Sequence, residues 1–225
     1  MTTSAPTVAS TERRTPLTRQ RVLETAVELA DRHGIESVSM RRLGQELGVE
    51  AMSLYTHVRS KDDLLDGMVE VVFEEVPLRR RRGAWKAGLR RAILDARAIL
   101  LRHPWAPAVI ETRSQPGPAM LRQYDTVMGI LREGGFSLEL THHAIHLMGS
   151  RLLGFVQDLN DDSPDLPPDA IAGLADQLRP THPHVAEMAL GVSHEGGLGG
   201  CDTDFEFIFA LDFILDGLER LRGRA

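Results

Sequence analysis

Residues 39–61 read SMRRLGQELGVEAMSLYTHVRSK, and their pattern predicts two short helices joined by a tight turn. Ser39 can cap the first helix, because a serine hydroxyl accepts a hydrogen bond from an unpaired backbone N–H of the first turn. Leu43 and Leu47 lie one helical turn apart and form a stripe that we expect to be buried. Gly48 follows, where a left-handed backbone favours glycine. The first helix is therefore expected to end at Leu47.

The second helix is predicted over residues 51–58, where Leu54 and Val58 are spaced to face inward. Gly44 is small enough to let the two helices approach each other closely. A helix-turn-helix of this kind places its second helix in the major groove of DNA. Six residues then face outward as candidates for DNA contact: Ala51, Met52, Ser53, Tyr55, Thr56 and His57.

The flanking sequence supports a complete DNA-binding domain. Residues 18–34 form an amphipathic helix, with Thr18 as its cap, Gly34 as its stop, and a core stripe of Val22, Ala26, Leu29 and Ala30. Downstream, Ser60 and Asp63 have the spacing of a capping box at the start of a helix over about 61–76. Lys61 in its first turn opposes the helix dipole, so a cation there makes more sense beside a DNA phosphate.

A resemblance emerges from this spacing. The pattern TxxxVLxxAxELxxxxGIExxSMRRLGxELGVxxxSLYxHVxxKxxLL, from Thr18 to Leu65, closely resembles the N-terminal domain of the tetracycline-repressor (TetR) family. The resemblance continues more weakly through Thr112-Arg113, residues 133–139 and the final helix, which suggests the tetracycline-repressor branch. It implies a homodimer that binds an operator in double-stranded DNA and is released from it by a small-molecule inducer.

Composition sets further limits. At 225 residues the chain can bury a substantial core, in one large domain or in a small domain plus a larger one. Cys201 is the single cysteine and cannot form an internal disulfide, which fits the cytosol. No apolar run approaches a membrane span of about 20 residues, and the N-terminus has no apolar signal-peptide core. A cytoplasmic protein without a membrane partner is expected.

The charge distribution bears on DNA binding. The net charge is −6, but residues 1–62 carry nine Arg or Lys and eight Asp or Glu, so the acidity lies in the C-terminal part. DNA contact then depends on the local placement of Arg41, Arg59 and Lys61 rather than on overall charge. Modest nonspecific affinity is expected.

The pattern along the chain predicts an all-α protein in three parts. Residues 1–16 form a disordered arm, residues 17–60 a three-helix helix-turn-helix DNA-binding domain, and residues 61–225 a larger helical ligand-binding and dimerisation domain. Helix 61–76 serves as connector. The arginine run at 79–82 is either a solvated loop or a contact to flanking phosphate. Further helices are expected over 84–102, 107–112, 117–134, 137–159, one or two within 170–192, and 204–221.

The final helix indicates a partner. It is apolar nearly all round, and such a helix must be buried on more than one face. Helix 137–159 also has two apolar faces. Two helices from each chain would form a four-helix interface in a homodimer, whereas the alternative is a central helix of a monomer.

The larger domain is expected to hold the inducer between helices 84–102, 117–134 and 137–159. Aromatic surface with a few polar groups is the usual make-up of a small-molecule cavity. Seven residues are candidates for its lining: His103, Trp105, Glu111, Arg113, His143, His146 and Phe155. The histidines of helix 137–159, His142 among them, could instead be interface or surface groups, or hold a metal, but no HExxH motif is present.

One departure from the family bears on the ligand. In the tetracycline-repressor branch, a histidine a few residues before the Thr-Arg pair chelates the drug-bound magnesium. Here Val109, Ile110 and Glu111 precede Thr112, so that histidine is missing, and Asp158 alone is a weak substitute. An inducer of another chemistry is expected, and no resident metal or cofactor.

Two other functions compete with a ligand-responsive regulator. One is a helix-turn-helix interaction protein without a ligand response, and the other is a metal-dependent enzyme. A catalytic site needs a nucleophile with its base, a metal triad or a cofactor loop. No GxSxG, GxxxxGK or CxxC motif is present, so an enzyme is not expected.

Overall fold

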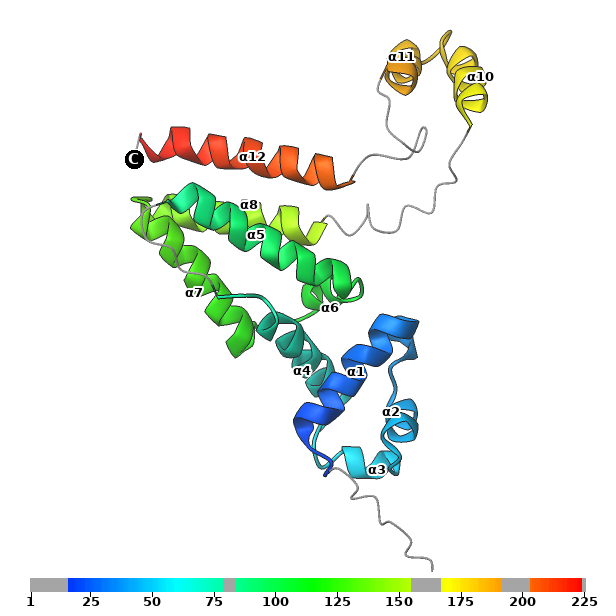
Figure 1. Ribbon diagram of the computed structural model, residues 1–225, viewed down its shortest axis with the longest axis vertical. Helices are drawn as coiled ribbons and strands as arrows, with labels where there is room; N and C mark the ends of the chain where they lie inside the picture. The colour runs from blue at the N-terminus through cyan, green and yellow to red at the C-terminus, as the bar shows by residue number, and fades with distance from the viewer. Residues whose placement is uncertain (1–15, 79–83, 155–166, 192–202, 224–225) are drawn as a thin grey trace, which may run out of the picture. The chain divides into compact units, whose positions relative to one another are not determined.

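The computed structural model describes residues 16–78, 84–154, 167–191 and 203–223, and every element within these ranges is a helix (Figure 1). The chain divides into two compact units, Met1–Leu64 and Leu65–Ala225. The division falls inside a helix, four residues beyond the boundary that the sequence suggested. None of the described helices is both long enough and apolar enough to cross a membrane. The N-terminal arm, the arginine run, Phe155, Asp158 and Cys201 lie outside the described residues.

The N-terminal unit follows the predicted caps closely. It contains α1 (Arg19–His33), a short 3₁₀ helix η1 (Ile35–Ser37), α2 (Met40–Leu47), α3 (Ala51–Leu54) and the start of α4 (Lys61–Glu74). The Thr18 hydroxyl accepts from Arg21 N–H, and the Ser39 hydroxyl accepts from Arg42 N–H. Gly48 ends α2 with φ of 66°, in the left-handed region. The predicted core of the unit is buried: Val22, Ala26, Leu29, Ala30, Leu43, Leu47, Leu54 and Val58.

The second helix of the motif is shorter than the predicted 51–58. The α-helix ends at Leu54, and the next backbone hydrogen bonds run to the third residue back, from Tyr55 to Met52 and from Thr56 to Ser53. The Thr56 hydroxyl also donates to Ser53 O, 2.6 Å away. A side-chain bond of this kind competes with regular helix, so the segment tightens into turns after its first helical turn.

The C-terminal unit contains the remaining helices. The rest of α4 is followed by α5 (Trp85–Arg102), α6 (Ala106–Glu111), α7 (Pro118–Glu133), α8 (Leu138–Gly154), α10 (Pro168–Leu178), α11 (Pro183–Gly191) and α12 (Thr203–Arg222). The two helices α10 and α11 pack against each other. The predicted helices 61–76 and 137–159 have described ends at Glu74 and Gly154, and residues 155–159 lie outside the described ranges.

Helices α5, α7, α8 and α12 enclose the core of this unit (Figure 1). Each contributes fully buried side chains, such as Leu89, Leu131, Met148 and Leu211. Trp85 packs edge to face on Phe136, with ring centroids 4.6 Å apart. Ion pairs join the outer surfaces of α5 and α12, from Lys86 to Asp216 and from Arg90 to Asp212, the latter at 2.7 Å. The sequence indicated two apolar sides on each of α8 and α12, and the structure buries one side of each helix in this core.

Candidate DNA interface and ligand cavity

The corner of the helix-turn-helix is built around Gly44. A Cβ at this position would lie 2.8 Å from Val49 O and 3.2 Å from Ala51 N, both backbone atoms. The absence of a side chain therefore lets α2 approach the start of α3, as the sequence indicated. Leu43 and Leu54 are fully buried in this unit, so the orientation of α3 is set by packing.

The outward surface of residues 51–61 carries several of the predicted contact groups. Met52 is 74% exposed and Tyr55 is 46% exposed. Thr56, Lys61 and Arg41 are also exposed, whereas Ala51, Ser53 and His57 are half-buried. The segment thus presents apolar, hydroxyl and cationic groups.

The hydroxyl groups of Ser53 and Thr56 on this surface both donate hydrogen bonds to backbone carbonyl oxygens. Ser53 Oγ donates to Glu50 O at 2.6 Å, and Thr56 Oγ1 donates to Ser53 O. Each oxygen keeps its lone pairs, so both act as acceptors toward an outside partner. Adenine N6 and cytosine N4 are the donors that the major groove offers.

Arg19 is a structural residue that sequence reasoning missed. Its guanidinium donates to both carboxylate oxygens of Asp63, at 2.7 and 3.1 Å, and to His57 O at 2.7 Å. Asp63 also accepts from Arg59 N–H at 2.8 Å, while Ser60 Oγ accepts from Asp63 N–H. The start of α1 thereby holds the turn between α3 and α4. The signal available in the sequence was the capping-box Asp63, but its partner lies 44 residues away.

These contacts affect the ionisation of Asp63. The hydrogen bonds from Arg19, followed by the one from Arg59 N–H, hold the pKa of the Asp63 carboxyl below its ordinary value. The carboxylate therefore stays charged and keeps its three hydrogen bonds at neutral pH.

The C-terminal unit contains an apolar cavity of about 80 Å³. Its wall comes from α4, the residues after it, α5, α7 and α8: Phe73, Val76, Ala92, Ile93, Ala96, Gln123, Tyr124, Val127, Ile145, Met148, Gly149 and Leu152. Gln123 is a polar lining group, and its amide donates to Val76 O at 2.7 Å. Sites for drug-sized ligands are typically about 300–1,000 Å³, so a ligand must widen this cavity.

The sequence-predicted ligand residues lie elsewhere. His103 and Trp105 are buried, with ring centroids 6.2 Å apart, at the junction of α5 and α6. Glu111, His143 and His146 are exposed, and Arg113 pairs with Asp66. None of these six residues is in the cavity lining, and Phe155 lies outside the described residues. The difference arises because the histidines occupy the solvent-facing side of α8, while Ile145, Met148 and Leu152 occupy its inner side.

Acidic residues of α4 and of the turn after it contact the surrounding helices. Asp66 pairs with Arg113 at 3.2 Å, and Glu75 pairs with Arg102 at 2.6 Å and faces His103 Nε2 at 3.4 Å. Glu70 Oε2 accepts from Ala119 N–H at 2.7 Å, so it caps the N-terminus of α7. Helix α4 is therefore tied to α7, and α7 supplies part of the cavity wall.

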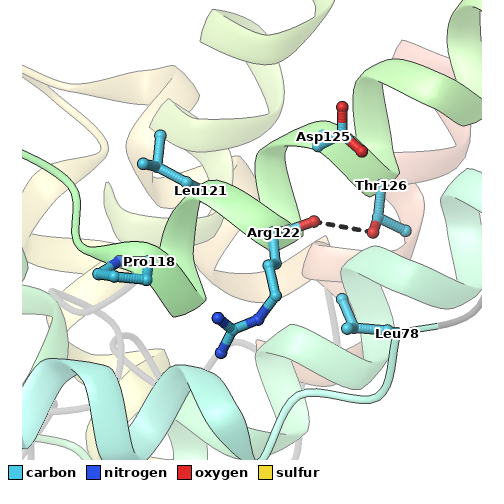
Figure 2. A pocket seen from close by; sticks show the side chains of 6 residues that line it. All are labelled: Leu78, Pro118, Leu121, Arg122, Asp125 and Thr126. Carbon is cyan, nitrogen blue, oxygen red and sulfur yellow. Dashed lines mark hydrogen bonds between the residues drawn. The ribbon is translucent and has the colours of Figure 1, made fainter.

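A second, open depression of about 880 Å³ lies on the outer side of α7. Figure 2 shows its lining, Leu78 and residues of α7 from Pro118 to Thr126, with the Thr126 hydroxyl bonded to Arg122 O. Its described lining contains no aromatic side chain and exposes Leu121, so it lacks the enclosure of a small-molecule site.

Within the described ranges of the chain, no group of three or more His, Cys, Asp or Glu side chains is placed to hold a metal ion. The histidines of α8 form a surface row, in which the His142 and His146 rings are 4.6 Å apart and the His142 and His143 rings are 5.7 Å apart.

Comparison with known proteins identifies the family. The family model for bacterial regulatory proteins of the tetR family matches residues 22–68, and the model for the tetracyclin repressor-like C-terminal domain matches residues 76–222. Together they span the helix-turn-helix and the helical unit that follows. The chain belongs to the TetR family of bacterial regulatory proteins.

Two of the similar proteins are regulators from Saccharopolyspora and Streptomyces. An HTH-type transcriptional regulator of Saccharopolyspora erythraea is 40% identical over 121 residues, 53% of this chain and 51% of that protein. The HTH-type transcriptional repressor DrrR1 of Streptomyces coeruleorubidus is 38% identical over 123 residues, 54% of this chain and 46% of that protein. The matches thus span about half the length of these two relatives.

A solved structure matches over nearly the whole length. The Streptomyces coelicolor TetR family protein ActR, in complex with actinorhodin, is 27% identical with a TM-score of 0.77. The match covers 93% of this chain and 100% of that chain. The two-unit helical fold is therefore shared.

Proposed function

We propose that this protein is a ligand-responsive transcriptional repressor that binds a near-palindromic operator as a homodimer. The observation that carries the proposal is the helix-turn-helix, whose α3 is anchored by the buried Leu54 while Met52 and Tyr55 are exposed. An interior-facing anchor with an outward contact surface is what major-groove recognition requires. Similarity to the repressor DrrR1 supports repression over activation.

Dimerisation is supported by the outer surface of α12 and α8. Phe205, Phe209 and Phe213 recur every four residues on α12, and Phe209 is 61% exposed. On α8, which contacts α12, Leu147 is exposed. Apolar side chains in such a row are uncommon on a monomer surface and mark an interaction site. A second copy of the same surface is the occupant that we propose, because a two-fold interface pairs identical patches.

The ligand response is proposed to run through the apolar cavity. Phe73 on α4 and Val76 just after it form part of the cavity wall, and α4 continues into the N-terminal unit. A ligand that widens the cavity must displace one of its helices. If the ligand binds the displaced conformer more tightly, it shifts the population away from the DNA-binding conformer, whereas equal affinity would shift nothing.

DNA binding is tested first. Genomic fragments retained by the protein are sequenced, and the enriched operator is measured by fluorescence anisotropy over a range of salt concentrations. Lys61→Ala should weaken binding to all DNA sequences alike. It should also reduce the slope of the logarithm of affinity against the logarithm of salt concentration by about one unit. Met52→Ala should instead change the preference at particular base pairs. An equal loss on every sequence for both variants would contradict the proposed interface.

The ligand site is tested on the preformed operator complex, with actinorhodin as the first probe because ActR is similar over its whole length. Gly149 is one of the residues that line the cavity, and a Cβ there meets no atom within 4 Å, so we expect the side chain of Gly149→Leu to occupy the cavity. It should keep operator binding and lose ligand-induced release. His143→Ala, on the exposed side of α8, serves as control. Loss of release in His143→Ala alone would favour the residues suggested by sequence over this cavity.

Tetracycline with magnesium provides a second ligand test. Because Val109, Ile110 and Glu111 stand where the tetracycline-repressor branch has a chelating histidine, the drug should not release the operator at micromolar concentration. Release at that level would show that the chain chelates the drug–magnesium complex with other groups.

A further inference from the structure

The exposed side of α8 carries a row of metal-binding side chains that the proposed DNA and ligand sites do not use. His142, His143 and His146 are all exposed, and the His142 and His146 ring centroids are 4.6 Å apart. Histidines four residues apart lie one above the other on the same face of a helix. The same spacing brings two histidines to one zinc ion on the helices of metalloproteases.

The distance between the two rings suits chelation. Imidazole nitrogens bind zinc at about 2.0–2.1 Å, so two nitrogens on one ion lie about 2.8–3.4 Å apart at angles between square and tetrahedral. Ring centroids 4.6 Å apart, with the ring planes at 71°, allow this after small side-chain rotations. Exposed side chains make such rotations at little cost. His143 is placed differently, because its Nε2 lies 4.0 Å from Glu139 Oε1.

One chain supplies too few ligands for a closed site. No three metal-binding groups come together within the described residues, and a structural zinc site is almost always four-coordinate. The missing ligands need a second source. His146 is followed directly by Leu147, and both side chains are exposed, so the pair lies beside the surface that we propose contacts a second copy. In a two-fold interface each copy contributes the same residues.

We propose that His142 and His146 of two copies bind one divalent transition-metal ion, zinc being the simplest case, and that the ion strengthens their association. This inference rests on the proposed dimer. Four neutral imidazoles form a nitrogen-rich site that favours Zn²⁺, Cu²⁺ or Ni²⁺ over Mg²⁺ and Ca²⁺, which prefer oxygen ligands.

The experiment uses tag-free full-length protein freed of metal with a chelator. Zinc binding is measured by competition with a chromogenic chelator, and association by sedimentation velocity with zinc or with EDTA. The expected result is one zinc per two chains and an association constant raised about tenfold or more. His142→Ala and His146→Ala should each lose both effects. His143→Ala, next to the pair, and His184→Ala, on α11, should keep them.

The outcomes separate this inference from the dimer itself. A dimer in EDTA that binds no zinc would overturn the metal site and leave the proposed dimer standing. Zinc bound at one ion per chain without any change in association would overturn the bridging role. A protein that stays monomeric in both EDTA and zinc would contradict the dimer. Unchanged zinc binding in both His142→Ala and His146→Ala would overturn the assignment of the ligands.

Discussion

At the scale of single residues, Gly44 shows how one missing side chain shapes the helix-turn-helix. Its nearest neighbours are backbone atoms of residues 49 and 51, which cannot move without changing the turn. Gly44→Ala is expected to destabilise the N-terminal unit by about 1–3 kcal/mol, the usual cost of overpacking. Hydrogen exchange of residues 39–58 and operator affinity measure the effect.

The matched control for this glycine is Gly173→Ala in α10. A Cβ there meets nothing within 4 Å, so the substitution should stabilise its helix by up to about 1 kcal/mol. If Gly44→Ala behaved in the same way, the close approach of α2 and α3 would not hold in solution.

Asp63 gives a pH-dependent prediction at the same scale. Hydrogen bonds from Arg19 and Arg59 lower the pKa of Asp63 in the folded state, so its contribution to stability is present above the unfolded pKa of about 3.9. That contribution is lost as the pH falls through the folded pKa. Arg19 and Asp63 are 43% and 29% exposed, so solvent screening limits the contribution to about 1 kcal/mol or less.

Asp63→Asn should therefore lower the thermal midpoint at pH 7, and the difference from the native protein should shrink as the pH is lowered toward and below the folded pKa. Thermal unfolding between pH 7 and the acid limit of solubility measures this. Glu36→Gln, at an exposed position in the same unit, is the control and should show little effect. A drop in the thermal midpoint of Asp63→Asn that is independent of pH would contradict the electrostatic explanation.

At the scale of elements, α4 and α7 are coupled through one carboxylate. Glu70 Oε2 caps α7 by accepting from Ala119 N–H, and within the described residues its buried Oε1 has no hydrogen-bond partner. A Cβ on Gly117 would lie 2.5 Å from Glu70 Cδ, so an alanine there must push the carboxylate away. Glu70→Ala and Gly117→Ala should each lower the free energy of unfolding by about 1 kcal/mol, the usual contribution of a helix cap.

Because both substitutions remove the same hydrogen bond, their effects should not add. The Glu70→Ala/Gly117→Ala double variant is expected to be no less stable than Glu70→Ala, as measured in a double-mutant cycle by chemical denaturation. Full additivity would mean that Gly117 acts independently of the cap. Hydrogen exchange at the start of α7 reports the loss of the cap directly.

At the scale of the whole molecule, α12 has two apolar sides with different roles. Leu215 is fully buried within the chain, whereas Phe209 is 61% exposed. Phe209→Asp should leave the chain folded and abolish dimerisation, because an unpaired carboxylate in an apolar contact is very costly. Leu215→Asp should unfold the C-terminal unit for the same reason. Sedimentation velocity and circular dichroism distinguish the two results, and a dimeric Phe209→Asp protein would place the interface elsewhere.

The family, the helical class and the buried faces of α1, α2 and α3 were available from the sequence. Ser39, Gly44 and Gly48 have local roles, and the leucine spacing in α2 repeats at the helical period, so these features depend only on near neighbours in the chain. The same holds for the Thr18 cap of α1. The family prediction was confirmed because its most specific residues lie in one continuous stretch.

The apolar cavity and the Arg19–Asp63 contact were decided by tertiary structure. The cavity wall comes from segments of four helices spread over residues 73–152, and composition could not show which side of α8 faces inward. Its mostly apolar lining resembles the interior of any helical protein, so the sequence drew attention instead to histidines that lie on the exposed side of α8. Which residues share a site depends on packing between segments distant in the chain, and local periodicity contains no record of that packing.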